Sequence, residues 1–279
     1  MIKSMVVAVD TSESSVRAQA YAVTLAKRYN AELTGIAVLD TPWVTRPMAM
    51  PIGGGHYKDH RDEKMLAKQR SELDKRISEF RDYCRKEGVP ARAVEVEGVP
   101  AEQIAHEADR HDLIIIGRDT NFHGVNGQDI GDEVEQLLRD NPRPVIMIPP
   151  NAPLPGKGVV VSFDGSIPAS RAMQMFHLMG LGKGERIHVL SIDEDDDKAQ
   201  LLAARGAAYF ESHGVSVTKH ALQASSEIAQ TILNTVESMN AGMLVMGAFS
   251  NRSLWRQLIV GSVTKQLLRA CPVPIFIHH

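Results

Sequence analysis

The best candidates for a binding site are the residues that follow the apolar run at 243–246. Gly247 ends this run, a polar loop at 250–253 follows, and Gly261 and Ser262 precede a pattern typical of a helix. Glycines let backbone N–H groups approach a phosphate closely, and a helix N-terminus adds partial positive charge. The stretch therefore predicts an anion site built mainly from main-chain donors.

The loop between these glycines also carries polar side chains. Arg252 and Arg256 lie in it, and a guanidinium suits the geometry of a phosphate. We expect Ser250, Asn251 and Arg252 to contribute to the site, together with Val263 at the start of the following helix. A plainer alternative stays open, in which the helix start is an ordinary one capped by its serine and both arginines are solvated.

Buried strands that alternate with helical patterns would position these residues. Strands are expected at 5–9, 33–39, 91–96, 113–116 and 144–148, then at 159–163, 187–192, 215–221, 243–246 and 274–277. Helices are expected after 11–15, at 64–87, starting within 98–102, at 134–139, after 165–170 through 179, and at 199–212, 225–239 and 263–269. This alternation predicts parallel sheets with helices on both faces.

The second half of the chain repeats the first. The matching pairs are Gly117 with Gly247, Gly131 with Gly261, Pro144 with Pro274, and Asp10 with Asp164. A proline-rich stretch separates the halves, so we place one domain at 1–150, a linker at 151–157 and a second domain at 158–279. The predicted fold class is α/β, with two tandem, doubly wound parallel-sheet domains, Rossmann-like or flavodoxin-like, that form an intramolecular pseudo-dimer. Right-handed crossovers would bring Asp164, Gly247 and Gly261 to one sheet edge.

Length and composition narrow the class of protein. The chain has 279 residues, 43% of them hydrophobic and 23% charged, with a net charge of −3. That balance argues against a nucleic-acid partner, which usually needs a basic face, and no apolar run reaches the roughly 20 residues that would span a membrane. The cysteines, Cys84 and Cys271, show neither CxxC nor zinc spacing. Together with a start that runs straight into a strand, they lead us to expect a cytoplasmic protein.

The stretch at 41–60 departs from the alternating pattern. It is rich in proline, glycine and methionine and shows no period. We interpret it as a long excursion or flap.

Six short motifs together resemble the universal stress protein (UspA) family in its tandem form, over nearly the whole chain. They lie at 6–10, 159–164, 112–117, 244–247 and 261–264 and in the closing Pro-Val strands. ATP-binding members of that family carry a glycine, two residues, a second glycine, nine residues and then Gly-Ser or Gly-Thr. Gly247 and Gly261-Ser262 match the two ends of this motif, whereas Ser250 replaces the second glycine and the interval is one residue longer.

The resemblance implies a function that the residues alone do not. It implies a cytoplasmic stress-response protein that binds ATP or AMP, with or without Mg²⁺, in its C-terminal half and acts by binding and signalling. It also implies that Asp164 meets the nucleoside, that the main chain of Ser191 meets the adenine, and that the fifth strands of the two halves pair. Ser262 and the arginines could support weak ATP hydrolysis, but no obvious water-activating base is present. A protein partner is expected without being identified, and a homodimer of the tandem chain is compatible with the family.

The N-terminal half departs further from the family motif. Gly131 is followed by Asp132 and Glu133, and Asp129 precedes it. A carboxylate at a helix start can occupy the anion site itself, and a phosphate beside it would be repelled. We therefore predict that the nucleotide site of this half is degenerate.

Two other readings stay open. One is a nucleotide-independent scaffold or chaperone-like module that uses the flap at 41–60 to dock a partner. The other is an enzyme such as a nucleotidyl transferase, which would need a basic motif that the chain lacks. No P-loop motif, Ser-His-Asp set, calcium loop or two-histidine helical spacing backed by a carboxylate is found, so we predict neither catalytic residues nor a catalytic metal.

Overall fold

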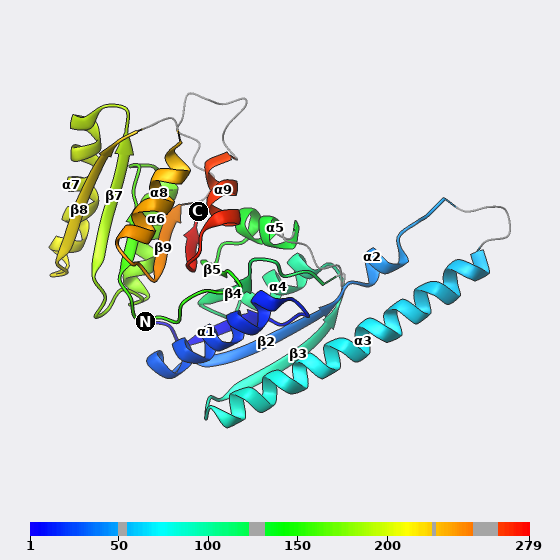
Figure 1. The fold of residues 1–279 in the computed structure, drawn as a ribbon. Helices are drawn as coiled ribbons and strands as arrows, with labels where there is room; N and C mark the ends of the chain where they lie inside the picture. Colours follow the sequence, from blue (N-terminus) through cyan, green and yellow to red (C-terminus); the bar gives the residue numbers. More distant parts are fainter. Residues whose placement is uncertain (50–54, 123–131, 225–226, 248–261) are drawn as a thin grey trace.

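The computed structural model describes residues 1–49, 55–122, 132–224, 227–247 and 262–279. In this part of the chain ten strands form one sheet in the order β3-β2-β1-β4-β5-β10-β9-β6-β7-β8 (Figure 1). The strands are β1 (Ser4–Ala8), β2 (Glu32–Leu39), β3 (Ala91–Glu97), β4 (Leu113–Gly117), β5 (Val145–Ile148), β6 (Val159–Ser162), β7 (Ile187–Asp193), β8 (Val217–Gln223), β9 (Met243–Gly247) and β10 (Ile275–His278). Each half contributes five neighbouring parallel strands, as the repeat predicted.

Helices cover both faces of the sheet. They are α1 (Glu13–Tyr29), α2 (Thr41–Thr45), α3 (Gly55–Lys86), α4 (Pro100–Ala108), α5 (Asp132–Asp140), α6 (Ile167–Leu178), α7 (Asp196–Ser212), α8 (Ile228–Ser238) and α9 (Ser262–Ala270). Buried side chains of α1, α3, α6 and α7 form one core with the sheet, and those of α4, α5, α8 and α9 form another on the opposite face. The central strands are buried on both faces, which explains why they are continuous apolar runs rather than alternating ones.

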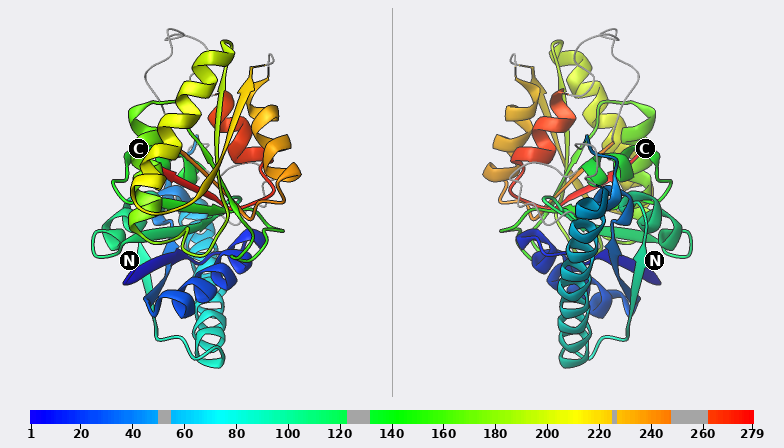
Figure 2. Two further views of the ribbon diagram at one scale, coloured as in Figure 1. Left: turned by 90° about the vertical axis from the view of Figure 1, so that its left-hand side faces the viewer. Right: turned by 90° about the vertical axis from the view of Figure 1, so that its right-hand side faces the viewer.

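The two halves meet where β5 pairs with β10. This is an antiparallel pairing, with Ile146 opposite Phe276 and both side chains fully buried. The predicted contact of the fifth strands is confirmed, and it joins the two parallel sheets into a single one. Figure 2 shows the halves toward opposite ends of the molecule, blue to cyan below and yellow to red mostly above. Across the same junction, Nη1 of Arg118 donates to the carbonyl of Arg269 at 2.7 Å, and Lys265 pairs with Glu135 at 3.1 Å.

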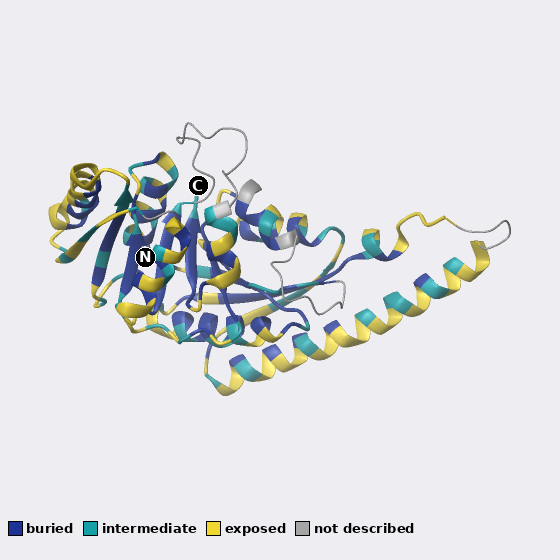
Figure 3. Ribbon diagram, turned by 45° about the horizontal axis from the view of Figure 1, so that its top comes forward, coloured by how far each residue is buried: buried dark blue, intermediate teal, exposed yellow. Residues whose placement is uncertain are grey.

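The described parts of the stretch at 41–60 include helical segments that its aperiodic sequence did not predict. Residues 41–45 form α2, capped by Asp40, whose Oδ1 accepts the N–H of Trp43 at 2.9 Å, and α3 begins at Gly55 rather than at 64. Lys58 links the two helices, because it pairs with Asp62 and donates to the Thr45 carbonyl at 3.0 Å. The first turns of α3 project past the sheet and are mostly exposed (Figures 1 and 3). Residues 50–54 lie outside the described part.

Smaller corrections concern element ends in the C-terminal half. α7 begins at Asp196 rather than 199, because the side chain of Asp195 accepts the N–H groups of Asp197 and Lys198 and caps the helix there. α8 begins at Ile228 rather than 225, and β8 runs from Val217 to Gln223 rather than over 215–221. These shifts leave the order of the elements as predicted.

Candidate functional site

The C-terminal half has its topological switch point at β6. This strand lies between β7 and β9 and runs parallel to both, so the carboxyl ends of all three strands open on the same sheet edge. In open α/β sheets such an edge is where ligands bind. The structure brings Asp164 and Gly247 to this edge, as predicted.

Asp164 lies in the turn between β6 and α6 and is exposed. Its Oδ1 accepts the N–H of Ser166 at 2.9 Å, and Ser166 Oγ in turn accepts the N–H of Ala169 at 3.2 Å, which caps α6. Gly165 between them has φ +75°, a conformation that suits glycine. The local sequence thus holds the Asp164 carboxylate in an exposed position at the carboxyl end of β6. The capping role of Ser166 was missed, although a serine just before a helix that starts Ile-Pro is a recognisable signal.

Ser191 lies near the end of β7 and is 1% exposed. Its Oγ donates to the carbonyl of Phe163 at 2.7 Å, which ties the end of β6 to β7. Because the hydroxyl is engaged inside the protein, any contact of Ser191 with a ligand would come from its main chain.

Gly247 ends β9 against the first turn of α6. A Cβ atom added there would lie 2.3 Å from the nitrogen of Ala169 and 2.4 Å from the carbonyl carbon of Pro168. Gly117 does the same in the N-terminal half, where a Cβ would lie 2.2 Å from Oγ of Ser14. Both glycines therefore serve the close packing of a strand on a helix. This structural role of Gly247 was missed, because we assigned the residue only to phosphate approach, although its repeat in Gly117 pointed to a role shared by both halves.

The remaining predicted residues lie at or beyond the described boundary. Ser250, Asn251, Arg252 and Gly261 lie outside the described residues. α9 begins at Ser262, one residue before the predicted start at Val263, and the side chain of Ser262 is also outside them. Val263 is half-buried and packs against the core beneath α9.

The corresponding edge of the N-terminal half is covered by its own chain. Asp10, the counterpart of Asp164, is 1% exposed, and its carboxylate accepts the Asn121 N–H at 2.6 Å and the Ser12 hydroxyl at 2.8 Å. Burial raises the pKa of Asp10 to about 6, against the lowering effect of these hydrogen bonds. Thr120 and Phe122, the neighbours of Asn121 in the sequence, are buried as well.

The predicted acidic obstruction of this edge involves residues that the structure does not describe in full. Asp129 and Gly131 lie outside the described residues, as do the side chains of Asp132 and Glu133. The contact of Asn121 with Asp10 was missed, because Asn121 contributes a main-chain N–H, and every residue type except proline carries that group.

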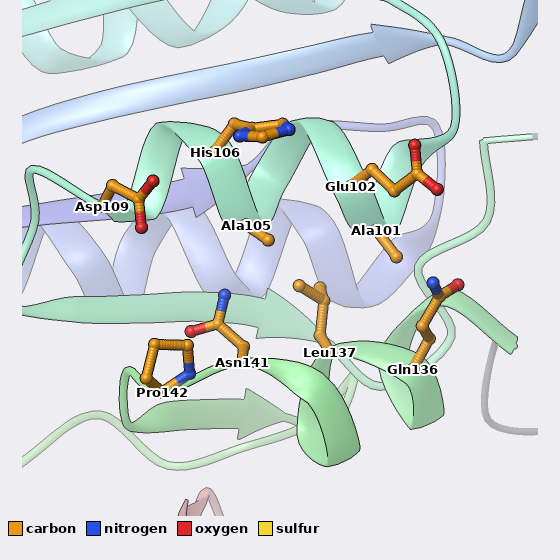
Figure 4. A pocket seen from close by; sticks show the side chains of 9 residues that line it. All are labelled: Ala101, Glu102, Ala105, His106, Asp109, Gln136, Leu137, Asn141 and Pro142. Atoms are coloured by element: carbon orange, nitrogen blue, oxygen red, sulfur yellow. The ribbon is translucent and has the colours of Figure 1, made fainter.

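A cavity of about 320 Å³ lies elsewhere, between α4 and α5 (Figure 4). Its lining residues are Ala101, Glu102, Ala105, His106, Asp109, Gln136, Leu137, Asn141 and Pro142. Figure 4 shows the side chains of Glu102, His106 and Asp109 pointing in different directions along α4. They do not converge on one point, and none of the predicted nucleotide residues lines this cavity.

Two properties of the described residues bear on the other classes of function. They contain no cluster of three or more histidine, cysteine or acidic side chains that could hold a metal ion. Among them, no helix combines the length and the hydropathy needed to cross a bilayer.

Comparisons with known proteins agree with this architecture. A universal stress protein of Synechocystis is 25% identical over 166 residues, which cover 59% of this chain and 56% of that protein, so the match spans little more than half of the relative. A universal stress protein of Methanocaldococcus jannaschii is 26% identical over 151 residues, or 53% of this chain and 82% of that one. The crystal structure of a universal stress protein from Archaeoglobus fulgidus superposes with a TM-score of 0.71 at 22% identity, covering 99% of this chain and 97% of the other.

The family model of the universal stress proteins matches this chain twice, at residues 1–149 and 157–279. These matches account for the repeat in the sequence and for the two five-stranded units of the sheet. The chain belongs to the universal stress protein family, as a tandem of two copies of its domain.

Proposed function

We propose that the protein binds one adenine nucleotide, ATP or AMP, at the carboxyl edge of its C-terminal half, and acts in the cytoplasmic stress response by binding rather than by catalysis. The observation that carries this proposal is the contrast between two equivalent aspartates. Asp164 is exposed at its edge, whereas Asp10 is buried under the segment that contains Asn121.

Three further features support a nucleotide at the C-terminal edge. The Asp164 carboxylate suits the hydroxyls of a ribose, and the main chain of Ser191 lies on the neighbouring strand. The start of α9 at Ser262 offers N–H groups and partial positive charge to a phosphate. Mg²⁺, where present, would be held mainly by the phosphates, as is usual for this ion.

The nucleotide that co-purifies with the protein tests this proposal. Freshly purified protein is denatured, and the released small molecules are identified by mass spectrometry and quantified by absorbance. We expect one equivalent of adenine nucleotide per chain, and none from a Gly261→Asp variant, which places an acid at the position before Ser262. Two equivalents per chain would contradict the asymmetry. Absence of nucleotide, with no heat stabilisation by added Mg-ATP, would contradict the binding itself.

One observation favours a second candidate function, docking of a protein partner by the 41–60 region. The projecting start of α3 exposes Tyr57 by 79%, and Met48 before it is 45% exposed. If the nucleotide experiment fails, a nucleotide-independent scaffold that uses this projection becomes the preferred function.

A further inference from the structure

Two histidines face each other on the last two strands of the sheet, β7 and β8, in the C-terminal half. His188 lies at the start of β7 and His220 lies in β8, the edge strand at the left of Figure 1. Nδ1 of His188 and Nε2 of His220 are 3.0 Å apart, with ring centroids separated by 5.1 Å. Both residues are half-buried, so the strands hold the rings while solvent still reaches them.

The pair is separate from the proposed nucleotide site. Side chains alternate along a strand, so His188 shares its face of β7 with Leu190, which packs in the core beneath α8. Ser191 points to the opposite face, where it reaches the Phe163 carbonyl. Beyond His220, Leu222 is 36% exposed, so this corner of the sheet face is partly open.

The distance between the two ring nitrogens suits a shared metal ion. A metal–nitrogen bond of about 2.0–2.1 Å and an angle between 90° and the tetrahedral value place two imidazole nitrogens roughly 2.9–3.4 Å apart. Without a metal, the same two atoms can share one N–H···N hydrogen bond, with one ring as donor and the other as acceptor. A metal ion would replace that shared proton after a modest rotation of the rings.

The ligand type selects among metals. Each ring presents one nitrogen to the other at 3.0 Å, so both nitrogens can act as ligands once the proton that they share is displaced. Lys219 pairs with Glu211 on α7. Because side chains alternate along a strand, Lys219 lies on the face of β8 opposite to His220. Imidazole ligands suit Cu²⁺, Ni²⁺ and Zn²⁺, whereas hard cations such as Ca²⁺ and Mg²⁺ prefer oxygen ligands.

We propose that His188 and His220 form a two-histidine site for a divalent transition-metal ion, with water in the remaining coordination positions. A separation near the lower end of the range favours the square or tetragonal arrangements of Cu²⁺ and Ni²⁺ over the tetrahedral one of Zn²⁺. At the equivalent positions of β2 and β3 the register places Thr34 and Val94, so the pair is not repeated there.

The repeat supplies matched variants for the test. His188→Thr and His220→Val install the residues that the N-terminal half carries at the same register, and both suit a strand. Two other histidine groups are controls, namely His177 with His213, whose rings lie 4.9 Å apart, and the terminal His278 with His279. His213→Gln and His279→Gln should leave the proposed site intact.

The experiment titrates Cu²⁺ into the full chain after dialysis against a chelator, with calorimetry for stoichiometry and electron paramagnetic resonance for the ligands. We expect one equivalent with two equatorial nitrogens, and an affinity roughly tenfold or more weaker in His188→Thr and in His220→Val. Ni²⁺ should follow the same pattern, and both control variants should keep the two-nitrogen signal.

Retention of that signal in either strand variant, or its loss in either control, would overturn the proposal, as would the absence of a two-nitrogen species in the parent protein. Circular dichroism of each metal-free variant verifies that it is folded. His220→Val lies on the exposed edge strand and tests the site independently if His188→Thr is poorly folded.

Discussion

The carboxylate of Asp10 accepts the main-chain N–H of Asn121 at 2.6 Å, across the two sides of the N-terminal switch point. This contact joins the turn after β1 to the loop after β4 and encloses a carboxyl group that is 1% exposed. Asp164 holds the equivalent place in the second half and is exposed. The same position of the repeat is therefore covered by the protein in the first half and exposed in the second.

The covered position makes stability depend on pH through Asp10. Its pKa is about 6 in the folded protein against about 3.9 for an unperturbed aspartate, so the folded chain binds the proton more tightly than the unfolded chain. The contribution of this group is therefore fully present below about pH 4 and is lost as the pH rises toward 6. Two pKa units correspond to at most about 3 kcal/mol.

The variant Asp10→Asn removes this titration. Relative to the parent, it should gain up to about 3 kcal/mol of unfolding free energy between pH 4 and pH 7, measured by urea denaturation at several pH values. The difference between the two proteins isolates this group, since every other carboxylate is shared. Parallel stability curves over that range would contradict the assignment.

The exposed position makes Asp164 the side chain to test for ligand contact. If it binds the nucleoside, Asp164→Ala should weaken adenine nucleotide binding about tenfold or more, because hydrogen bonds to a charged group contribute roughly 1.5–3 kcal/mol. Calorimetry with ATP and with AMP measures the effect. Asp10→Asn is the matched control in the other half and should leave the affinity unchanged, whereas an equal loss in both variants would point to an indirect effect on folding.

Both glycines that end β4 and β9 should resist substitution for a steric reason. Gly117→Ala and Gly247→Ala would each force a methyl group into the first turn of a helix, at 2.2 Å from Ser14 Oγ and 2.3 Å from Ala169 N, respectively. Overpacking of this kind costs about 1–3 kcal/mol or more in unfolding free energy. Gly55→Ala is the control, because no atom lies within 4 Å of the added methyl, and it should be neutral or slightly stabilising. A neutral Gly247→Ala would disprove the close packing of β9 on α6.

Much of the fold could be predicted from the sequence because its pattern is local and repeated. Apolar runs such as 113–116 identify buried strands, and the matching of Asp10 with Asp164 reveals the tandem repeat. The start of α3 was missed, since Lys58 and Asp62 stabilise it through an ion pair and a contact with Thr45 rather than through apolar periodicity. The pattern of apolar residues does not predict polar contacts of this kind.

The candidate site was predictable to the extent that strand ends determine it. Parallel strands bring Asp164, Ser191 and Gly247 to neighbouring strand ends once the order is known. What covers Asp10 was not predictable, because Asn121 contributes only a backbone N–H. The tight packing at Gly247 depends on the distance between β9 and α6, which is a three-dimensional property.

The junction of the halves gives the last prediction. Phe276 in β10 is fully buried, lies opposite Ile146 of β5, and meets Phe176 of α6 edge to face with ring centroids 5.7 Å apart. Truncating a buried phenylalanine costs about 3–5 kcal/mol. Because this strand pair joins the sheet of one half to that of the other, the loss should also weaken their coupling.

Phe276→Ala should therefore lower the unfolding midpoint and convert a single urea transition into two, observed by circular dichroism and by tryptophan fluorescence. Trp43 in the first half and Trp255 in the second give each half a tryptophan, and removing one of them identifies which half unfolds first. Leu178→Ala is the control, because that side chain is 63% exposed and its truncation should change stability by no more than about 0.5 kcal/mol. If Phe276→Ala kept one transition at the parent midpoint, β5 and β10 would not be the structural link between the halves.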